Sequence, residues 1–485
     1  MHDGARTRLF GILIAIAVVL PAAIALARQA ELRPASYLPM IVSMVVPEPE
    51  PSPTPEPSPT PGPSPTPGPS PTPQPEPPAS FFGVVMTNIA PERGLDSAVA
   101  AGASWVRSNN NILWRDIEPT EGAGYHWDTP AMQRIEQEMI RASQQNLRLI
   151  TIVRGSPRWA TTPYAADCAP INPTKYARFA AFVAAAVARY SRPPYNAMYW
   201  QIGNEPDANI FPNDSGFGCW GVKSDPYYGG RAYGEMLNVV YPAIKAANPA
   251  VKVLHGSLLL NTRYHPEIPA SVSGRFLEGV FLAGAANSFD ILAYNAYVWA
   301  SNENTADWKT PYLLGLMQTY NVPRKPMIIT EQAVLCSSAC PKLQSYWVGR
   351  FYARAASSNL LGSLWYIYDS DSFNHTALVE PNAPSQLRPA YSAYKHAAAQ
   401  LRDAQDIGPL LGQPADVEGY RFAVPGGELT IFWSPNARPV AIPVAEGATV
   451  LCTMWDGGSL PCANNAGVVA LTADIAPIYV VVSTR

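Results

Sequence analysis

Apolar and amphipathic segments alternate along the chain from residue 80 to residue 405. The apolar segments are five to eight residues long and rich in β-branched and aromatic residues, which favours β-strands. The longer segments between them place apolar residues at three- and four-residue steps, which predicts helices with one buried face. Eight strands are predicted, at residues 81–87, 103–108, 147–154, 197–203, 251–257, 289–294, 326–330 and 362–368.

Each predicted strand is followed by a helical segment, and this repeat predicts a (β/α)8 TIM barrel over residues 80–405. The alternative with the same alternation is a doubly wound open sheet. That fold binds phosphate through a glycine-rich loop after its first strand, and no such loop follows residues 81–87. The pattern therefore favours the closed barrel.

After residue 405 the pattern changes to short β-rich runs separated by Gly, Pro and Asn. Residues 406–485 are therefore predicted to form a small C-terminal antiparallel β domain. A separate carbohydrate-binding module is the functional alternative. The short length of the segment and its direct join to the last barrel helix favour a domain packed against the barrel.

The first 30 residues contain an apolar run, residues 9–27, preceded by Arg6 and Arg8. The run ends in Ala-Leu-Ala, a pattern typical of signal peptidase sites, and it is also just long enough to span a bilayer. Residues 1–30 are therefore predicted to be either a signal peptide or a membrane anchor. Both alternatives place the rest of the chain outside the cell, secreted or tethered to the outer face of the membrane.

Residues 31–79 are predicted to be a disordered linker rich in Pro, Ser and Thr, because every second residue from 47 to 77 is proline. Proline has no N–H to donate and pushes the preceding residue towards extended conformations, so neither a helix nor a sheet can form. As a polyproline II helix, residues 47–78 would reach roughly 100 Å at about 3.1 Å per residue. We interpret this segment as a spacer.

Composition and charge limit the partners of the chain. Its 485 residues carry a formal net charge of −3, without the basic excess of nucleic-acid-binding proteins. The 12 Trp and 24 Tyr fit sugar stacking as well as ordinary packing. The histidines show no spacing typical of a metal site, so neither a metal nor another cofactor is predicted.

Six cysteines fit an exported protein that contains disulfides. Two pairs lie close together in the sequence, and the remaining two cysteines are left for a long-range bond between loops. The predicted pairs are Cys336–Cys340, Cys452–Cys462 and Cys168–Cys219.

Two glutamates follow predicted strands at the same end of the barrel. Glu205 lies in the stretch WQIGNEPD after the fourth strand, and Glu331 follows the seventh strand in KPMIITEQ. Catalytic groups in this fold project from the C-terminal ends of the strands, so the two carboxylates are predicted to face each other across the barrel mouth. Retaining glycoside hydrolysis requires such a pair, a nucleophile and a proton donor about 5 to 5.5 Å apart.

The stretches WQIGNEPD and ITEQ resemble the strand-four and strand-seven motifs of glycoside hydrolase clan A, whose enzymes are (β/α)8 barrels acting with retention. The resemblance covers about residues 80–403 and is closest to family 39, with family 5 as runner-up. It implies that Glu205 is the acid/base and that Glu331 is the nucleophile.

Two further motifs extend the resemblance to clan A. WVR on the second strand implies that Arg107 lies near Glu331 and helps to keep it ionised. DILAYNAY resembles a pattern in which Asp is followed five residues on by His and seven on by Tyr, so Tyr297 is expected to hydrogen-bond Glu331. Asn295 occupies the histidine position, and this departure concerns the sugar subsite.

The resemblance also implies substrate-binding residues outside the carboxylate pair. Asn204 would bind the sugar 2-hydroxyl, and Trp365 in GSLWYIYD would form the aromatic floor under the sugar. Trp159, after the third strand, is a candidate for a sugar subsite, as are Trp220 and Trp299. The C-terminal β domain resembles the accessory β-sandwich that packs against many barrels of this clan.

The leading hypothesis is an exported retaining glycoside hydrolase that cleaves a polysaccharide or oligosaccharide by double displacement. A barrel that binds glycan without turnover, acting as a surface lectin, belongs to a different functional class and is the first alternative. A degenerate binder is expected to lose at least one of Arg107, Glu205, Tyr297 and Glu331, and all four are present. A transglycosidase is the second alternative, since it needs the same residues.

Overall fold

The structure is a computed structural model, and it describes residues 80–161, 168–208, 218–265, 272–300 and 307–483. The predicted signal or anchor segment, residues 1–30, and the predicted linker, residues 31–79, lie outside the described residues. Among the helices in the described ranges, none has the length and apolar content that crossing a bilayer requires.

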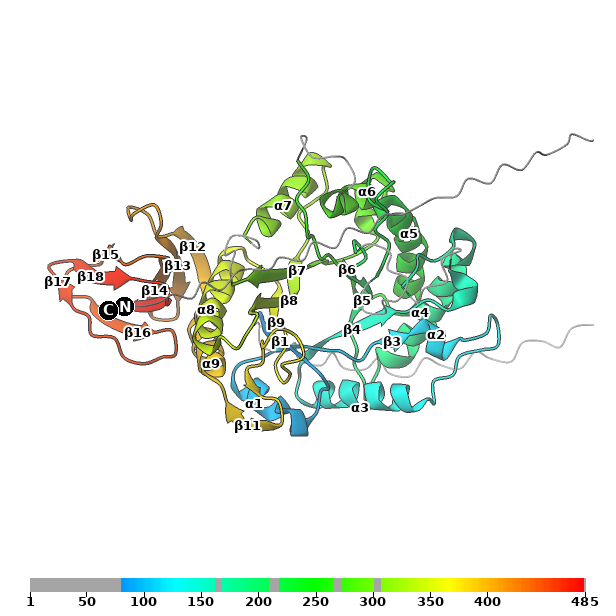
Figure 1. The fold of residues 1–485 in the computed structure, drawn as a ribbon, viewed down its shortest axis with the longest axis horizontal. Coiled ribbons are helices and arrows are strands. Elements are labelled where there is room, and N and C mark those ends of the chain that lie inside the picture. The colour runs from blue at the N-terminus through cyan, green and yellow to red at the C-terminus, as the bar shows by residue number, and fades with distance from the viewer. Residues whose placement is uncertain (1–79, 162–167, 209–217, 266–271, 301–306, 484–485) are drawn as a thin grey trace, which may run out of the picture. The chain divides into compact units, whose positions relative to one another are not determined.

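Eight parallel strands form a nearly closed barrel surrounded by helices (Figure 1), which confirms the predicted fold. Their order is β6-β5-β4-β2-β1-β9-β8-β7, and single bridges from Leu254 to Ile291 and from Leu258 to Tyr294 join β6 to β7. A two-residue strand, β3 (Ile112–Leu113), pairs with β4 beside the ring. The barrel strands are β1 (Phe82–Met86), β2 (Trp105–Ser108), β4 (Arg148–Arg154), β5 (Tyr199–Asn204), β6 (Lys252–Ser257), β7 (Leu292–Trp299), β8 (Met327–Leu335) and β9 (Gly362–Trp365).

Helices form where the sequence predicted amphipathic segments. Thr129 caps α3 by accepting a hydrogen bond from the N–H of Met132 at 3.2 Å, and Pro130 occupies the first helical position. The α-helices are α1 (Leu95–Ala100), α2 (Trp114–Ile117), α3 (Pro130–Gln144), α4 (Tyr176–Tyr190), α5 (Gly230–Ala247), α6 (Phe276–Leu282), α7 (Lys309–Thr319), α8 (Pro341–Ser357) and α9 (Pro389–Leu401). Short 3-10 turns occur at Pro91–Arg93, Arg158–Ala160, Pro173–Lys175, Ser273–Arg275 and Ala285–Asn287.

The barrel has one apolar layer inside the ring and another between strands and helices. The inner layer contains Val85, Trp105, Ile150, Leu254, Ile291, Ala293, Ile328 and Leu364. A β-carbon on Gly83 would lie 2.6 Å from the side chain of Leu364 and 2.7 Å from that of Trp105. Glycine at this position therefore lets the large indole of Trp105 fill the ring interior, which is closely packed.

Beyond α9 the chain forms the predicted antiparallel β domain. Its five-stranded sheet has the order β12-β13-β14-β19-β16, and its three-stranded sheet has the order β15-β18-β17. Arg354 of α8 holds the domain through paired hydrogen bonds to Glu418, both 2.7 Å long. The strands are β12 (Gln405–Pro409), β13 (Glu418–Val424), β14 (Gly427–Trp433), β15 (Arg438–Pro443), β16 (Thr449–Met454), β17 (Asn464–Asn465), β18 (Val468–Ala473) and β19 (Ile478–Ser483).

Three disulfides are present, and they join the predicted pairs: Cys168–Cys219, Cys336–Cys340 and Cys452–Cys462. The bond between Cys168 and Cys219 closes a loop of 51 residues and links the segment before α4 to the segment after β5. It therefore ties two loops that leave neighbouring barrel strands.

We expect loss of the long-range disulfide to destabilise the barrel more than loss of a local one. Loop-closure entropy gives about 4 kcal/mol for the 51-residue loop of Cys168–Cys219 and about 2 kcal/mol for the four-residue separation of Cys336–Cys340. The double variant Cys168→Ser/Cys219→Ser should lower the free energy of unfolding in a denaturant titration by roughly twice as much as Cys336→Ser/Cys340→Ser. Equal losses in the two variants would contradict the expectation.

Candidate active site

A cavity of about 740 Å³ lies at the carboxyl ends of the barrel strands. Its lining combines apolar and aromatic side chains with a few charged and amide groups, which is the usual composition of a ligand site. The lining residues are Arg107, Asn109, Asn111, Arg154, Asn204, Glu205, Leu259, Leu260, Asn261, Tyr297, Trp299, Lys309, Glu331, Leu335, Tyr366 and Phe373.

Glu205 follows β5 directly and turns into this cavity through an unusual backbone conformation. Its φ of 49° lies in the left-handed region, which costs a non-glycine residue of order 1–3 kcal/mol. The backbone N–H of Glu205 donates to the carbonyl of Ser257 on β6 at 2.9 Å, and this bond fixes the turn. The carboxyl group is buried and accepts a hydrogen bond from Nδ2 of Asn295 at 2.7 Å.

The amide of Asn295 is held in one orientation by two hydroxyl groups. Its Oδ1 accepts from Ser257 Oγ at 2.7 Å and from Thr330 Oγ1 at 2.9 Å. A carbonyl oxygen that accepts two bonds leaves only the amide nitrogen to face Glu205. Asn295 is fully buried and does not line the cavity, so it contacts the acid instead of the sugar subsite in which the sequence placed it.

Glu331 lies at a bulge inside β8, which continues beyond the predicted strand end at residue 330. The ladder with β7 pairs Tyr294 with Ile329 and Asn295 with Glu331, so Thr330 has no partner in the register. Regular alternation would send Thr330 and Glu331 to opposite faces. The extra residue lets Thr330 contact Asn295 inside the barrel while Glu331 lines the cavity.

The two carboxylate oxygens of Glu331 have different donors. Arg107 Nη2 lies 2.5 Å from Oε1, and the hydroxyl of Tyr297 donates to Oε2. The same Arg107 nitrogen donates to Oδ1 of Asn204 at 3.0 Å, so the ion pair also orients the amide beside Glu205. The structure thus brings together five of the predicted site residues, Arg107, Asn204, Glu205, Tyr297 and Glu331.

The two glutamates differ in their electrostatic surroundings. Burial raises the pKa of Glu205 well above its usual value, and the nearby negative charge of Glu331 raises it further. The hydrogen bond from Asn295 lowers the pKa of Glu205 and offsets part of this rise. Burial, followed by the charges of both glutamates, also raises the pKa of Tyr297 well above its usual value, so Tyr297 stays a neutral donor.

Asp207 and Lys309 are buried, and they hydrogen-bond the backbone of the segment after β6, which forms one wall of the cavity. Asp207 accepts hydrogen bonds from the N–H groups of Leu259 and Leu260, both at 2.7 Å. Burial raises the pKa of Asp207 to about 6 and lowers the pKa of Lys309 to about 8. Lys309 donates to the carbonyls of Leu259 and Asn295 at 2.9 and 2.8 Å, so it joins this wall to the strand that carries Tyr297.

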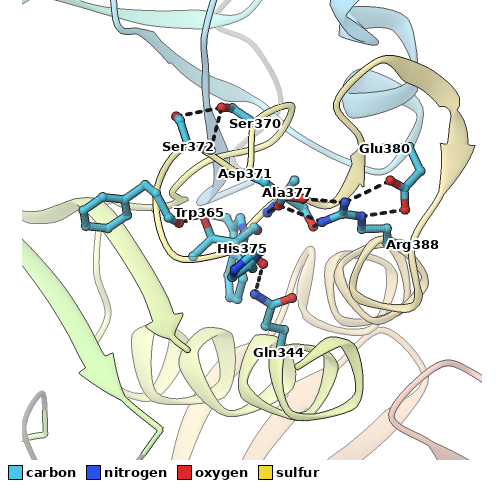
Figure 2. Close-up of polar contacts among 11 residues, drawn as sticks. Gln344, Trp365, Ser370, Asp371, Ser372, His375, Ala377, Glu380 and Arg388 are labelled. Atoms are coloured by element: carbon cyan, nitrogen blue, oxygen red, sulfur yellow. Dashed lines mark hydrogen bonds and ion pairs between the residues drawn. The ribbon is translucent and has the colours of Figure 1, made fainter. Parts of the chain in front are cut away.

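Three of the tryptophans considered for sugar binding, Trp365, Trp159 and Trp220, do not line the cavity. Trp365 is fully buried and its indole N–H donates to the carbonyl of Thr376 at 2.8 Å (Figure 2), so the predicted aromatic floor is wrong for this residue. The next residue, Tyr366, lines the cavity instead, because successive side chains point to opposite faces. Trp159 packs on Trp114 with ring centroids 5.0 Å apart and likewise lies outside the lining.

The segment between β9 and α9 supplies an aromatic wall that the sequence did not reveal. Phe373 lines the cavity, with its ring 5.2 Å from Tyr366 and 5.3 Å from Tyr297. Tyr366 follows from strand alternation once the register is known. Phe373 lies in a segment without periodicity, so no sequence signal marked it.

Polar contacts fix the segment that carries Phe373 (Figure 2). Arg388 pairs with Asp371 at 2.7 and 2.8 Å and with Glu380 at 2.9 Å, and it thereby closes the base of the segment. Gln344 of α8 donates to the carbonyl of His375 near its tip. The aromatic wall is therefore supported from both ends.

Several solved structures with the same fold are glycoside hydrolases. A family 39 glycoside hydrolase from the gut symbiont Bacteroides cellulosilyticus has a TM-score of 0.64 and 18% identity, covering 84% of this chain and 81% of that chain. A family 30 endoxylanase from Clostridium papyrosolvens has a TM-score of 0.58 and 10% identity, covering 84% and 97%. A family 39 β-xylosidase from Caulobacter crescentus has a TM-score of 0.55 and 13% identity, covering 84% and 97%.

At these identities the likeness shows the fold. It agrees with the clan A barrel implied by WQIGNEPD and ITEQ. No protein-family model matches the sequence, and the search of curated proteins found no match. The function is therefore inferred from the site.

We expect Glu205→Gln to stabilise the protein at neutral pH. The folded-state pKa of Glu205 is raised above the value of about 4.3 for an exposed glutamate. Protonated Glu205 therefore makes its full contribution to the free energy of unfolding below about pH 4. This contribution is lost as the pH rises through the raised pKa of the folded state. Removing the charge should recover about 1.4 kcal/mol for each unit of the shift.

Denaturant unfolding of wild type and Glu205→Gln between pH 4 and pH 8 measures this difference. The advantage of the variant should grow with pH and vanish near pH 4. Glu92→Gln, which alters an exposed glutamate, serves as the control and should show no such trend. An equal difference at every pH would show that the effect does not come from the proton of Glu205.

Proposed function

We propose that this chain is an exported retaining glycoside hydrolase. The observation that carries the proposal is the pair Glu205 and Glu331, two buried carboxyl groups that line one cavity in different surroundings. Glu205 has a raised pKa and a single amide donor, as a proton donor requires. Glu331 accepts from a guanidinium and a phenol, which suits a group that reacts as a carboxylate.

In the proposed first step, Glu331 attacks the anomeric carbon while Glu205 protonates the departing glycosidic oxygen. The bond between that carbon and the oxygen breaks, and a covalent glycosyl ester of Glu331 forms. Oε1 of Glu205 accepts the bond from Asn295, so the transferred proton belongs on Oε2. Asn295 thereby directs the acid towards the open side of the cavity.

In the second step, Glu205 as a carboxylate takes a proton from water. The water oxygen attacks the same anomeric carbon, the ester bond breaks, and Glu331 returns to its starting form. Two inversions give retention of configuration. Arg107 pairs with the departing carboxylate and Tyr297 donates to it, and both contacts stabilise the charge that returns to Glu331.

The proposed substrate is a β-linked polysaccharide or oligosaccharide, with Asn204 placed to bind the sugar 2-hydroxyl. Structures with this fold include an endoxylanase and a β-xylosidase, which supports a β-linked carbohydrate. Export is supported by the apolar run at residues 9–27 and by three disulfides, which persist in oxidising compartments.

We expect Glu205→Gln and Glu331→Gln to lose at least about a thousandfold in kcat/KM, because general acid catalysis alone contributes about 10²–10⁴-fold. A panel of aryl glycosides and polysaccharides would identify the substrate used. Glu138→Gln is a matched control, since burial raises the pKa of Glu138 to about 7 although it does not line the cavity. Full activity in Glu331→Gln would overturn the mechanism, and glycan binding without turnover in the wild type would favour the lectin.

Azide rescue should tell the two glutamates apart. In Glu331→Gly, azide fills the space of the nucleophile and attacks the anomeric carbon once, so the glycosyl azide should have the anomeric configuration opposite to the substrate. In Glu205→Gly, azide attacks the glycosyl ester, so the product should keep the substrate configuration. NMR spectroscopy of the products measures both outcomes, and the reverse pattern would exchange the two assigned roles.

A further inference from the structure

Alternate residues of β7 form a row of side chains that leads from the barrel centre to the cavity mouth. Asn295 contacts Glu205, Tyr297 contacts Glu331, and Trp299 is the last residue of the strand. Residues two apart share a face, and each step of two advances about 6.6 Å. Trp299, which also lines the cavity, therefore lies about one sugar-ring length further out than Tyr297.

Trp299 differs from the other large aromatic residues in its exposure. About half of the surface of Trp299, 49%, is open to solvent, whereas Trp105, Trp200 and Trp365 are fully buried. Its ladder partner Leu335 lines the same cavity, so the indole and this leucine form a continuous apolar surface. Packing explains the buried tryptophans, but it does not explain an indole that is half exposed in the lining of a cavity.

The volume of the cavity is large enough for more than one sugar ring. Its volume of about 740 Å³ falls within the range of about 300–1,000 Å³ for sites that enclose drug-sized ligands. Tyr366 and Phe373 already supply an aromatic surface next to Tyr297, which is where the sugar attacked by Glu331 would lie. Trp299 is thus a second aromatic surface, beyond the row of reacting groups.

We propose that Trp299 is the stacking platform for a second sugar unit, adjacent to the one held at the carboxylates. The C–H face of a sugar ring is apolar and its rim is polar, so it matches a half-exposed indole in a cavity that also presents carboxylate and amide groups. The proposal rests on the proposed function. It predicts that the preferred substrate is a chain of sugars and not a glycoside with a small non-sugar leaving group. Trp299 sets this preference without taking part in bond cleavage.

Chain-length dependence tests the proposal. Trp299→Ala should lower kcat/KM for oligosaccharides about tenfold to a hundredfold, because the apolar contact with the second ring is lost. A monosaccharide glycosyl fluoride, which has no ring in its leaving group, should be cleaved within about twofold of the wild-type rate. Trp299→Phe should recover most of the loss. Equal losses on both substrates, or no loss on oligosaccharides, would overturn the proposal.

A binding measurement separates this inference from the proposed function. Calorimetry on Glu331→Gln and on Glu331→Gln/Trp299→Ala gives oligosaccharide affinity without turnover. Weaker binding in the double variant supports the platform even if the wild type cleaves nothing, in which case only the proposed function fails. Unchanged binding, or no binding by Glu331→Gln, overturns the platform. Trp127→Phe, at a tryptophan outside the cavity lining, is the control for general loss of an indole.

Discussion

The hydrogen bond from Asn295 to Glu205 is the contact on which the rest of the site depends. The amide is oriented by Ser257 and Thr330, whose hydroxyls hydrogen-bond its carbonyl oxygen and leave its nitrogen facing Glu205. An amide donates at every pH at which the protein is folded, whereas a histidine at this position would change its hydrogen bonding on titration. Asn295 therefore gives Glu205 a hydrogen-bond donor that does not titrate.

Burying two carboxyl groups beside one cavity is costly, and the structure offsets only part of the cost. Arg107 compensates the charge of Glu331, but Glu205 has an amide partner and no cation in direct contact among the interactions described for it. The remaining penalty appears as the raised pKa of Glu205, which keeps a proton available at higher pH. The same burial that destabilises the fold at neutral pH thus makes Glu205 suited to proton donation.

Residues at strand ends leave a clear signal in the sequence, whereas residues whose position depends on register or on loops do not. Eight apolar runs indicate where the carboxyl ends of the strands lie and so predict the position of Glu205, whereas Arg107 and Tyr297 were expected only from the resemblance to clan A. Trp365 was misplaced because one residue of register decides whether it or Tyr366 faces the cavity.

Two other features left no periodic signal in the sequence. The bulge at Thr330 adds one residue to β8, which alternation alone does not reveal, and it is the reason that Thr330 and Glu331 both face inward. Phe373 reaches the cavity through a segment held by contacts between residues distant in sequence, such as Gln344 with His375. Such contacts follow from the complete fold and not from a local pattern.

Helix α8 connects the C-terminal β domain to the end of the barrel that bears the cavity. It follows β8, the strand that carries Glu331, and near its start Gln344 supports the segment bearing Phe373 (Figure 2). Further along, Arg354 pairs with Glu418 of the β domain, and its guanidinium lies over Trp433 at 5.4 Å. A helix anchored in this way cannot shift without breaking the hydrogen bond of Gln344 near its start and the charged and aromatic contacts of Arg354 near its end. The β domain therefore contributes to the site by holding this helix, although it supplies no residue to the cavity lining described above.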